Sequence, residues 1–117
     1  MATVRIGAVA AASSVAITLI VAPSASAATI SGTNTCIHHA TRARTAPVGI
    51  WVEPIGGGSP GWAVNTRRAT YSDFSFTANG ATRFVLRTGC GGTPQNWASS
   101  ITSPPVNGIG TTITNTW

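Results

Sequence analysis

Cysteine and histidine side chains gather at one place in the sequence, where Cys36 closely precedes the pair His38-His39. Together with Cys90 they offer two sulfurs and two imidazoles, the number of ligands that a tetrahedral zinc site needs. In an extended strand, however, His38 shares a face with Cys36 while His39 points to the opposite face. Oxidation of the two cysteines would also remove both thiolates. The sequence therefore predicts a solvated histidine pair, with no metal site and no cofactor.

Carboxylates are scarce in this sequence: Glu53 and Asp73 are the only acidic residues. A cysteine nucleophile would need Cys90 as a free thiolate beside an oriented histidine, and a glycosidase would need both carboxylates in its active site. Asp73 is instead expected to pair with Arg83 or Arg87 on a neighbouring strand, the ordinary role of such an acid in a sheet. No motif of the known catalytic families is present. The sequence predicts a protein without a catalytic centre.

The first 27 residues have the pattern of a secretory signal peptide. A single positive charge at Arg5 precedes an apolar run over residues 6–22, and Ala25-Ser26-Ala27 forms the expected cleavage site. The run is shorter than the roughly 20 residues that a membrane-spanning helix needs. Residues 1–27 are therefore predicted to be removed, leaving residues 28–117 as one small domain of a secreted, extracellular protein with no transmembrane segment.

Export also decides the interpretation of the two cysteines. Outside the cytosol, two cysteines in a small domain favour a disulfide, here Cys36 with Cys90, and two free thiols are the alternative. The bond would close a loop of about 55 residues, for which chain entropy gives a stabilisation of roughly 4 kcal/mol. Cys90 is therefore expected to be structural rather than reactive.

The segments that follow the signal are rich in Thr, Val, Ile and aromatic residues, and none keeps helical periodicity without a glycine or proline. The pattern predicts an all-β fold: a small single-domain antiparallel β-sandwich, with immunoglobulin-like and barrel-like forms both open. Strands are expected over residues 29–40, 48–53, 62–66, 70–77, 82–88, 97–102 and 109–117. Turns are expected over residues 54–61, 79–80, 89–94 and 103–108.

The pair Asn79-Gly80 predicts a β-hairpin between the strands on either side. A two-residue loop would place the large apolar side chains on opposite faces, whereas a three-residue loop with Gly80 in the left-handed position places them on one face. This register predicts four core residues: Phe74, Phe76, Phe84 and Leu86. The opposite face of the hairpin is expected to be wet and positively charged: Asp73, Ser75, Thr77, Arg83, Val85 and Arg87.

The order Cys36, Trp51, Cys90 is similar to that of an immunoglobulin-like sandwich, in which a tryptophan packs on a disulfide that joins the two sheets. The resemblance is an analogy that covers these three residues. Position 88 is Thr where that fold carries a tyrosine, and glycines follow Cys90 where a strand would continue. The resemblance therefore names no family.

The formal net charge of the chain is +5, and all seven basic residues are arginines. A basic, exported domain is attracted to acidic surfaces, so the expected partner is an acidic secreted protein or an anionic cell-envelope polymer. No motif for specific nucleic-acid recognition is present. We predict a secreted bacterial binding module, such as a hydrolase inhibitor or an envelope-polymer binder. A cationic antimicrobial or toxin-like effector is the alternative, and an uncharacterised hydrolase is the third interpretation.

Binding is expected at the loop over residues 54–61, at the turn over residues 91–97 and on the arginine-bearing face of the predicted hairpin. An exposed indole beside such loops can stack on sugars or fill a partner's pocket, although at least two of the four tryptophans are expected in the core. Arg67-Arg68 is expected to be a solvated turn. The candidate binding residues are Trp62, Arg83, Arg87, Gln95, Asn96 and Trp97.

Overall fold

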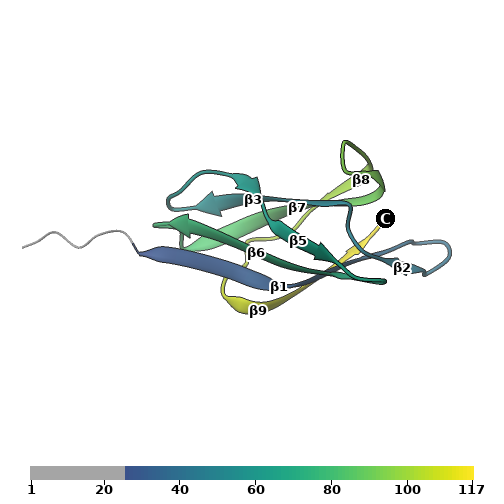
Figure 1. Ribbon diagram of the computed structural model, residues 1–117, viewed down its shortest axis with the longest axis horizontal. Helices are drawn as coiled ribbons and strands as arrows, with labels where there is room; N and C mark the ends of the chain where they lie inside the picture. The colour runs from purple at the N-terminus through teal and green to yellow at the C-terminus, as the bar shows by residue number, and fades with distance from the viewer. Residues whose placement is uncertain (1–25) are drawn as a thin grey trace, which may run out of the picture.

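Two β-sheets packed face to face make up residues 26–117, the part of the chain that the computed structural model describes (Figure 1). No helix occurs among these residues. The all-β sandwich with its disulfide confirms the expected fold class. The predicted signal peptide lies outside the described residues except for Ser26 and Ala27, and the first strand begins at Ala27.

The first sheet is built around its longest strand. Its five strands are β1 (Ala27–Ile37), β2 (Arg44–Thr45), β5 (Val64–Arg67), β6 (Ser72–Asn79) and β9 (Ile109–Thr116). β1 pairs with β6 through Asn34 and then with β2 from Cys36, while β9 pairs along its other edge. The β1–β9 pair is parallel, whereas the other strand pairs of the described chain are antiparallel.

The second sheet carries the surface that concerns function. Its four strands are β3 (Gly49–Ile55), β4 (Gly61–Trp62), β7 (Arg83–Thr93) and β8 (Asn96–Thr102), in the order β4-β3-β7-β8. Because Ala63 alone separates β4 from β5, the strand predicted over residues 62–66 is divided between the two sheets. The turn predicted over residues 89–94 is also wrong, since β7 continues to Thr93. Gly91 and Gly92 adopt φ angles of 73° and 82°, which only glycine adopts readily, and the strand remains paired with β8.

The strand order corresponds to that of an immunoglobulin-like sandwich, with β9 in the place of the first strand and parallel to its neighbour. A disulfide joins Cys36 of β1 to Cys90 of β7, and therefore joins the two sheets. Trp51, in contrast, does not occupy the interior position that the analogy implied. Its neighbours Ile50 and Val52 are buried, so strand alternation places Trp51 on the outer face of the second sheet.

The predicted hairpin between residues 70–77 and 82–88 is wrong, because β6 and β7 belong to different sheets. Gly80 does adopt a positive φ of 80°, but the connection crosses from one sheet to the other. A turn signal specifies a local reversal of the backbone; here β6 pairs with β1 over eight residues and β7 pairs with β3 over seven. The wet face expected for the hairpin is thus divided between the outer surfaces of the two sheets.

The predicted core residues are nevertheless correct. Phe74, Phe84 and Leu86 are buried, and the half-buried Phe76 packs edge-to-face against Phe84 with ring centroids 6.3 Å apart. They meet because β6 and β7 face one another across the sandwich instead of lying side by side. The buried apolar cluster also includes Ile30, Ile50, Val52, Ala78, Ala81 and Ile113.

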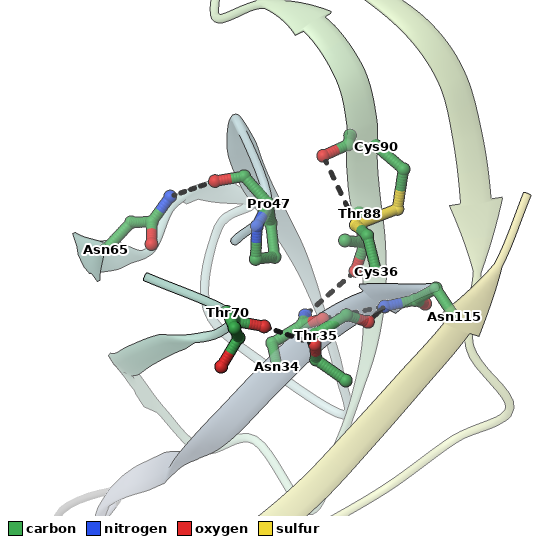
Figure 2. The surroundings of a disulfide bond; sticks show 10 residues. Asn34, Thr35, Cys36, Pro47, Asn65, Thr70, Thr88, Cys90 and Asn115 are labelled. Carbon is green, nitrogen blue, oxygen red and sulfur yellow. Dashed lines mark hydrogen bonds between the residues drawn. A yellow bond between two sulfur atoms is a disulfide. The ribbon is translucent and has the colours of Figure 1, made fainter. Parts of the chain in front are cut away.

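The interior becomes polar near the disulfide (Figure 2). The buried Asn34 side chain donates to Thr88 Oγ1 at 2.9 Å and accepts from Asn115 Nδ2 at 2.7 Å. Asn115 Nδ2 also donates to the carbonyl of Thr35. These bonds connect β1, β7 and β9, so the polar residues and the disulfide hold the same end of the sandwich together.

Candidate functional site

A row of four side chains crosses the outer face of the second sheet. Trp62 lies opposite Trp51, Trp51 opposite Arg87, and Arg87 opposite Thr102. Directly opposed residues of paired strands point to the same face of a sheet. β4, β3, β7 and β8 therefore each contribute one member to this row, which begins with two indoles and continues with an arginine and a threonine.

Trp97 lies beside this row on a surface made by two glycines. Gly49 and Gly89 are opposed in the register of β3 and β7, and a Cβ atom added to either would overlap the Trp97 indole. The indole Nε1 donates to the carbonyl of Pro94 at 3.2 Å. The glycines thus allow the ring to lie directly against the backbone, and the hydrogen bond fixes its orientation.

Three indoles meet edge-to-face on this surface. The ring centroids of Trp51 and Trp62 are 4.9 Å apart, those of Trp62 and Trp97 are 5.8 Å apart, and the interplanar angles are 74° and 73°. Trp62 is 62% exposed, and no tryptophan belongs to the buried core of the described chain. The expectation that at least two tryptophans would be buried in the core is therefore wrong. Smaller residues fill the interior, and β3 directs Trp51 outward.

A hollow of about 720 Å³ opens beside Trp62 and Trp97. Its remaining lining residues are Pro94 and Gln95, from the short turn between β7 and β8, and Asn96 at the start of β8. The backbone N–H of Asn96 donates to Thr93 Oγ1 at 3.1 Å, which fixes the shape of this turn. The hollow therefore combines two apolar aromatic surfaces with two exposed amide side chains.

Four of the six predicted binding residues line this one hollow: Trp62, Gln95, Asn96 and Trp97. Arg87 lies in the adjoining row, whereas Arg83 lies opposite Ile55, towards the other end of β7. Pro94 belongs to the turn over residues 91–97 at which the sequence predicts binding, whereas sequence reasoning missed Gly49 and Gly89 as the surface beneath Trp97. It also missed Trp51. The apolar residues Ile50 and Val52 on either side of Trp51 indicate, by strand alternation, that this indole faces outward.

Arg87 does not carry a free charge to the hollow, because Glu53 neutralises it. Arg87 Nε donates to Glu53 Oε2 at 3.0 Å, and Trp51 Nε1 donates to the same oxygen at 3.3 Å. The hydrogen bond from Arg87 holds the pKa of Glu53 below its usual value, assisted by the positive charge and by the Trp51 bond and opposed by desolvation. The lining of the hollow itself includes no ionisable side chain.

The predicted pairing of Asp73 with Arg83 or Arg87 is wrong. Asp73 Oδ2 accepts from Arg68 Nε at 2.8 Å across the β5–β6 hairpin. Arg83 and Arg87 lie on the other sheet and are not cross-strand neighbours of Asp73. This ion pair belongs to the end of the first sheet and does not contribute to the hollow.

The disulfide confirms the predicted pairing of Cys36 with Cys90, so neither sulfur is a thiolate. His38 stacks on His39 with centroids 4.9 Å apart and meets the edge of Trp117 at 4.8 Å. Within residues 26–117, no three His, Cys, Asp or Glu side chains are grouped closely enough to hold a metal ion.

In the same stretch of chain, no helix has the length and apolar character needed to cross a bilayer. No protein-family model, curated protein or solved structure matches the chain significantly. Inference about function therefore rests on the hollow and its surroundings.

Proposed function

We propose that the protein is a secreted binding module that holds sugar rings of an anionic cell-envelope polymer in the hollow beside Trp62 and Trp97. The observation that carries this proposal is the pairing of exposed indoles with the Gln95 and Asn96 amides around one hollow. A pyranose ring presents C–H groups on its faces and hydroxyls around its edge. Indoles pack against the former, and amides both donate to and accept from the latter.

The rigidity of the hollow supports binding. Trp97 is fixed by Gly49, Gly89 and the Pro94 carbonyl, and Thr93 orders the adjoining turn. Groups that are already ordered in the free protein lose little conformational entropy when a ligand arrives. The disulfide one strand residue beyond Gly89 adds to this order.

The chemistry of the lining also favours binding over catalysis. Tryptophan, proline, glutamine and asparagine side chains cannot act as general acids or bases near neutral pH. Glu53, the carboxylate that borders the row, is engaged by Arg87 and Trp51. A disulfide-bonded fold and a signal-like leader are compatible with an extracellular binding role.

Co-sedimentation with purified cell-wall sacculi tests the proposal. Replacement of the exposed Trp62 by Ala is expected to weaken binding by roughly tenfold, because central aromatic contacts dominate such sites. The matched control is Ile109→Ala, which removes an apolar side chain that is 81% exposed and lies outside the hollow. Circular dichroism and thermal unfolding establish that both variants are folded.

A second variant tests how Trp97 is positioned. Gly89→Ala should displace the indole and weaken binding, whereas Ser100→Ala on the neighbouring strand should not. Quenching of tryptophan fluorescence by soluble wall fragments follows the same change. Failure of the wild-type protein to bind sacculi, or equal binding by Trp62→Ala, would contradict the proposal. Stoichiometric capture of an acidic secreted protein in place of sacculi would favour the hydrolase-inhibitor interpretation.

A further inference from the structure

Most of the described arginines that have no acidic partner lie at the disulfide end of the sandwich, and none of them lines the hollow. Among the described residues, Glu53 pairs with Arg87 and Asp73 pairs with Arg68. The other four arginines are exposed. Arg83 lies at the start of β7, whereas Arg42, Arg44 and Arg67 belong to the end of the sandwich that contains the disulfide.

The strand register places two of these residues at that end, and the loop before β2 carries the third, Arg42. Arg44 of β2 lies opposite Ile37, next to Cys36 on β1. Arg67 lies opposite Ser72, which in turn lies opposite Asn34. Figure 1 shows β2, its preceding loop and the turn between β5 and β6 at the same end of the molecule as the turn between β7 and β8. We name Arg42, Arg44 and Arg67 the basic end.

The loop that carries Arg42 is held in a defined shape. His38 N–H donates to the Ala43 carbonyl, and Arg42 N–H donates to the His38 carbonyl, which closes the loop. His39 Nδ1 also bonds with the Trp117 carbonyl at 2.7 Å. Within this loop Arg42 has a φ of 62°, the only positive φ of a non-glycine residue in the described chain. A left-handed arginine is unfavourable, and such backbone strain concentrates at functional positions.

We infer that the basic end is a second binding site, which contacts the anionic oxygens of the polymer whose sugar rings occupy the hollow. The inference rests on the proposed function and specifies its ligand as a glycan with charged groups outside the rings in the hollow. The two surfaces have complementary chemistry: the hollow has no ionisable lining residue, and the basic end offers three guanidinium groups without an acidic partner. Guanidinium groups bind phosphate and carboxylate oxygens through paired N–H donors.

The test compares the variant Arg42→Gln/Arg44→Gln/Arg67→Gln with wild type at low and raised salt. The probes are intact sacculi, sacculi stripped of phosphodiester polymers by mild acid, and sacculi whose carboxylates have been amidated. Wild type should bind intact sacculi more tightly than at least one stripped form, and salt should reduce that advantage. The triple variant should lose the advantage, roughly tenfold in affinity, and should bind uncharged sugar through the hollow as wild type does. The treatment that removes the advantage identifies the anionic group.

Two further variants keep the test decisive. Arg42→Gly removes one charge and relieves the left-handed backbone, so it should weaken binding without lowering thermal stability. Arg83→Gln removes an exposed arginine outside the basic end and should bind like wild type. Unchanged salt dependence in the triple variant, or an equal loss in Arg83→Gln, would overturn the inference. Weaker binding by Trp62→Ala with its salt dependence intact would support two separate sites, whereas no effect of Trp62→Ala would contradict the proposed function.

Discussion

The two halves of the sandwich interior are held together by different forces. In the half far from the disulfide, Phe74, Phe84 and Leu86 meet in a continuous apolar cluster. In the other half, Asn34, Thr88 and Asn115 form a buried hydrogen-bonded network beside Cys36–Cys90. The apolar half is stabilised by burial, which is not directional. The polar half depends on directional bonds and on a covalent link between the sheets.

This difference coincides with a division of function. The turn of Pro94, Gln95 and Asn96 and the basic end both lie at the disulfide end, as Figure 1 shows for their strands. A directional, crosslinked interior fixes the relative positions of the strands that carry these surfaces. We therefore expect damage to the apolar half to lower stability alone, and damage to the disulfide half to lower both stability and binding.

The largest expected effect is the loss of stability in Phe84→Ala. Phe84 is 1% exposed at the centre of the apolar cluster, and truncation of a buried phenylalanine costs about 3–5 kcal/mol through lost burial and a residual cavity. Urea unfolding measures the free energy of unfolding, and sacculus binding is measured under conditions where the variant remains folded. A lower affinity of folded Phe84→Ala for sacculi would contradict the expectation that the apolar half contributes to stability alone.

The next effect follows removal of the disulfide in Cys36→Ala/Cys90→Ala. Loss of a native disulfide from a small domain costs about 2–5 kcal/mol, and the buried cysteines sit beneath the strands that lead to the hollow. Here affinity for sacculi should fall as well, because β7 and β8 lose their link to β1. Hydrogen exchange should increase more around Cys90 of β7 and the adjoining part of β8 than around Phe84 and Leu86 in the apolar half. A uniform increase would argue against local loosening.

A smaller effect is expected for Asn34→Ala, which tests the polar network itself. The substitution leaves Thr88 Oγ1 and Asn115 Nδ2 each without one partner in a buried site, a cost of about 1–3 kcal/mol. Thr29→Ala is the matched control, because it removes only the exposed hydroxyl contact with Thr77 and should change stability by less than about 0.5 kcal/mol. Chemical denaturation distinguishes the two, and equal losses would show that the network adds nothing beyond a surface contact.

Three kinds of feature could be predicted from the sequence: those that depend on the alternation of apolar and polar residues, on amino-acid composition, and on the expected export of the protein. The all-β class, the Cys36–Cys90 bond and the burial of Phe74, Phe84 and Leu86 follow from such patterns. Strand pairing could not be predicted in the same way, because a turn signal at Gly80 serves equally for a hairpin and for a crossing between sheets. The core survived that error, since inward-facing residues of β6 and β7 meet in either arrangement.

Four of the residues that line the hollow could be chosen from the sequence, but their assembly into one site could not be predicted. Trp62 and Trp97 are recognisable in the sequence as indoles beside loops. The two indoles come together only in the β4–β3–β7–β8 sheet, which no local signal specifies. The sequence predicts a turn from Gly89 onward, whereas β7 continues through this residue and its lack of a side chain accommodates the Trp97 indole of β8. Charge could not be located either, because each acidic residue neutralises a particular arginine only in the folded chain.

The smallest expected effect concerns the pH dependence of the ion pair that borders the aromatic row. The pKa of Glu53 is lowered in the folded protein chiefly by the Arg87 hydrogen bond. A carboxyl with a lowered folded-state pKa stabilises the protein above its unfolded pKa, and the contribution disappears as pH falls through the folded pKa. Wild type should therefore exceed Glu53→Gln in thermal midpoint at neutral pH, and the difference should close in acid below the ordinary range of glutamate. Both side chains are well exposed, so the difference should be small. A difference that persists in acid would show that Glu53 acts through packing against Trp51 and not through its charge. The outer face of the second sheet would then be stabilised by non-directional packing, as the apolar half of the interior is.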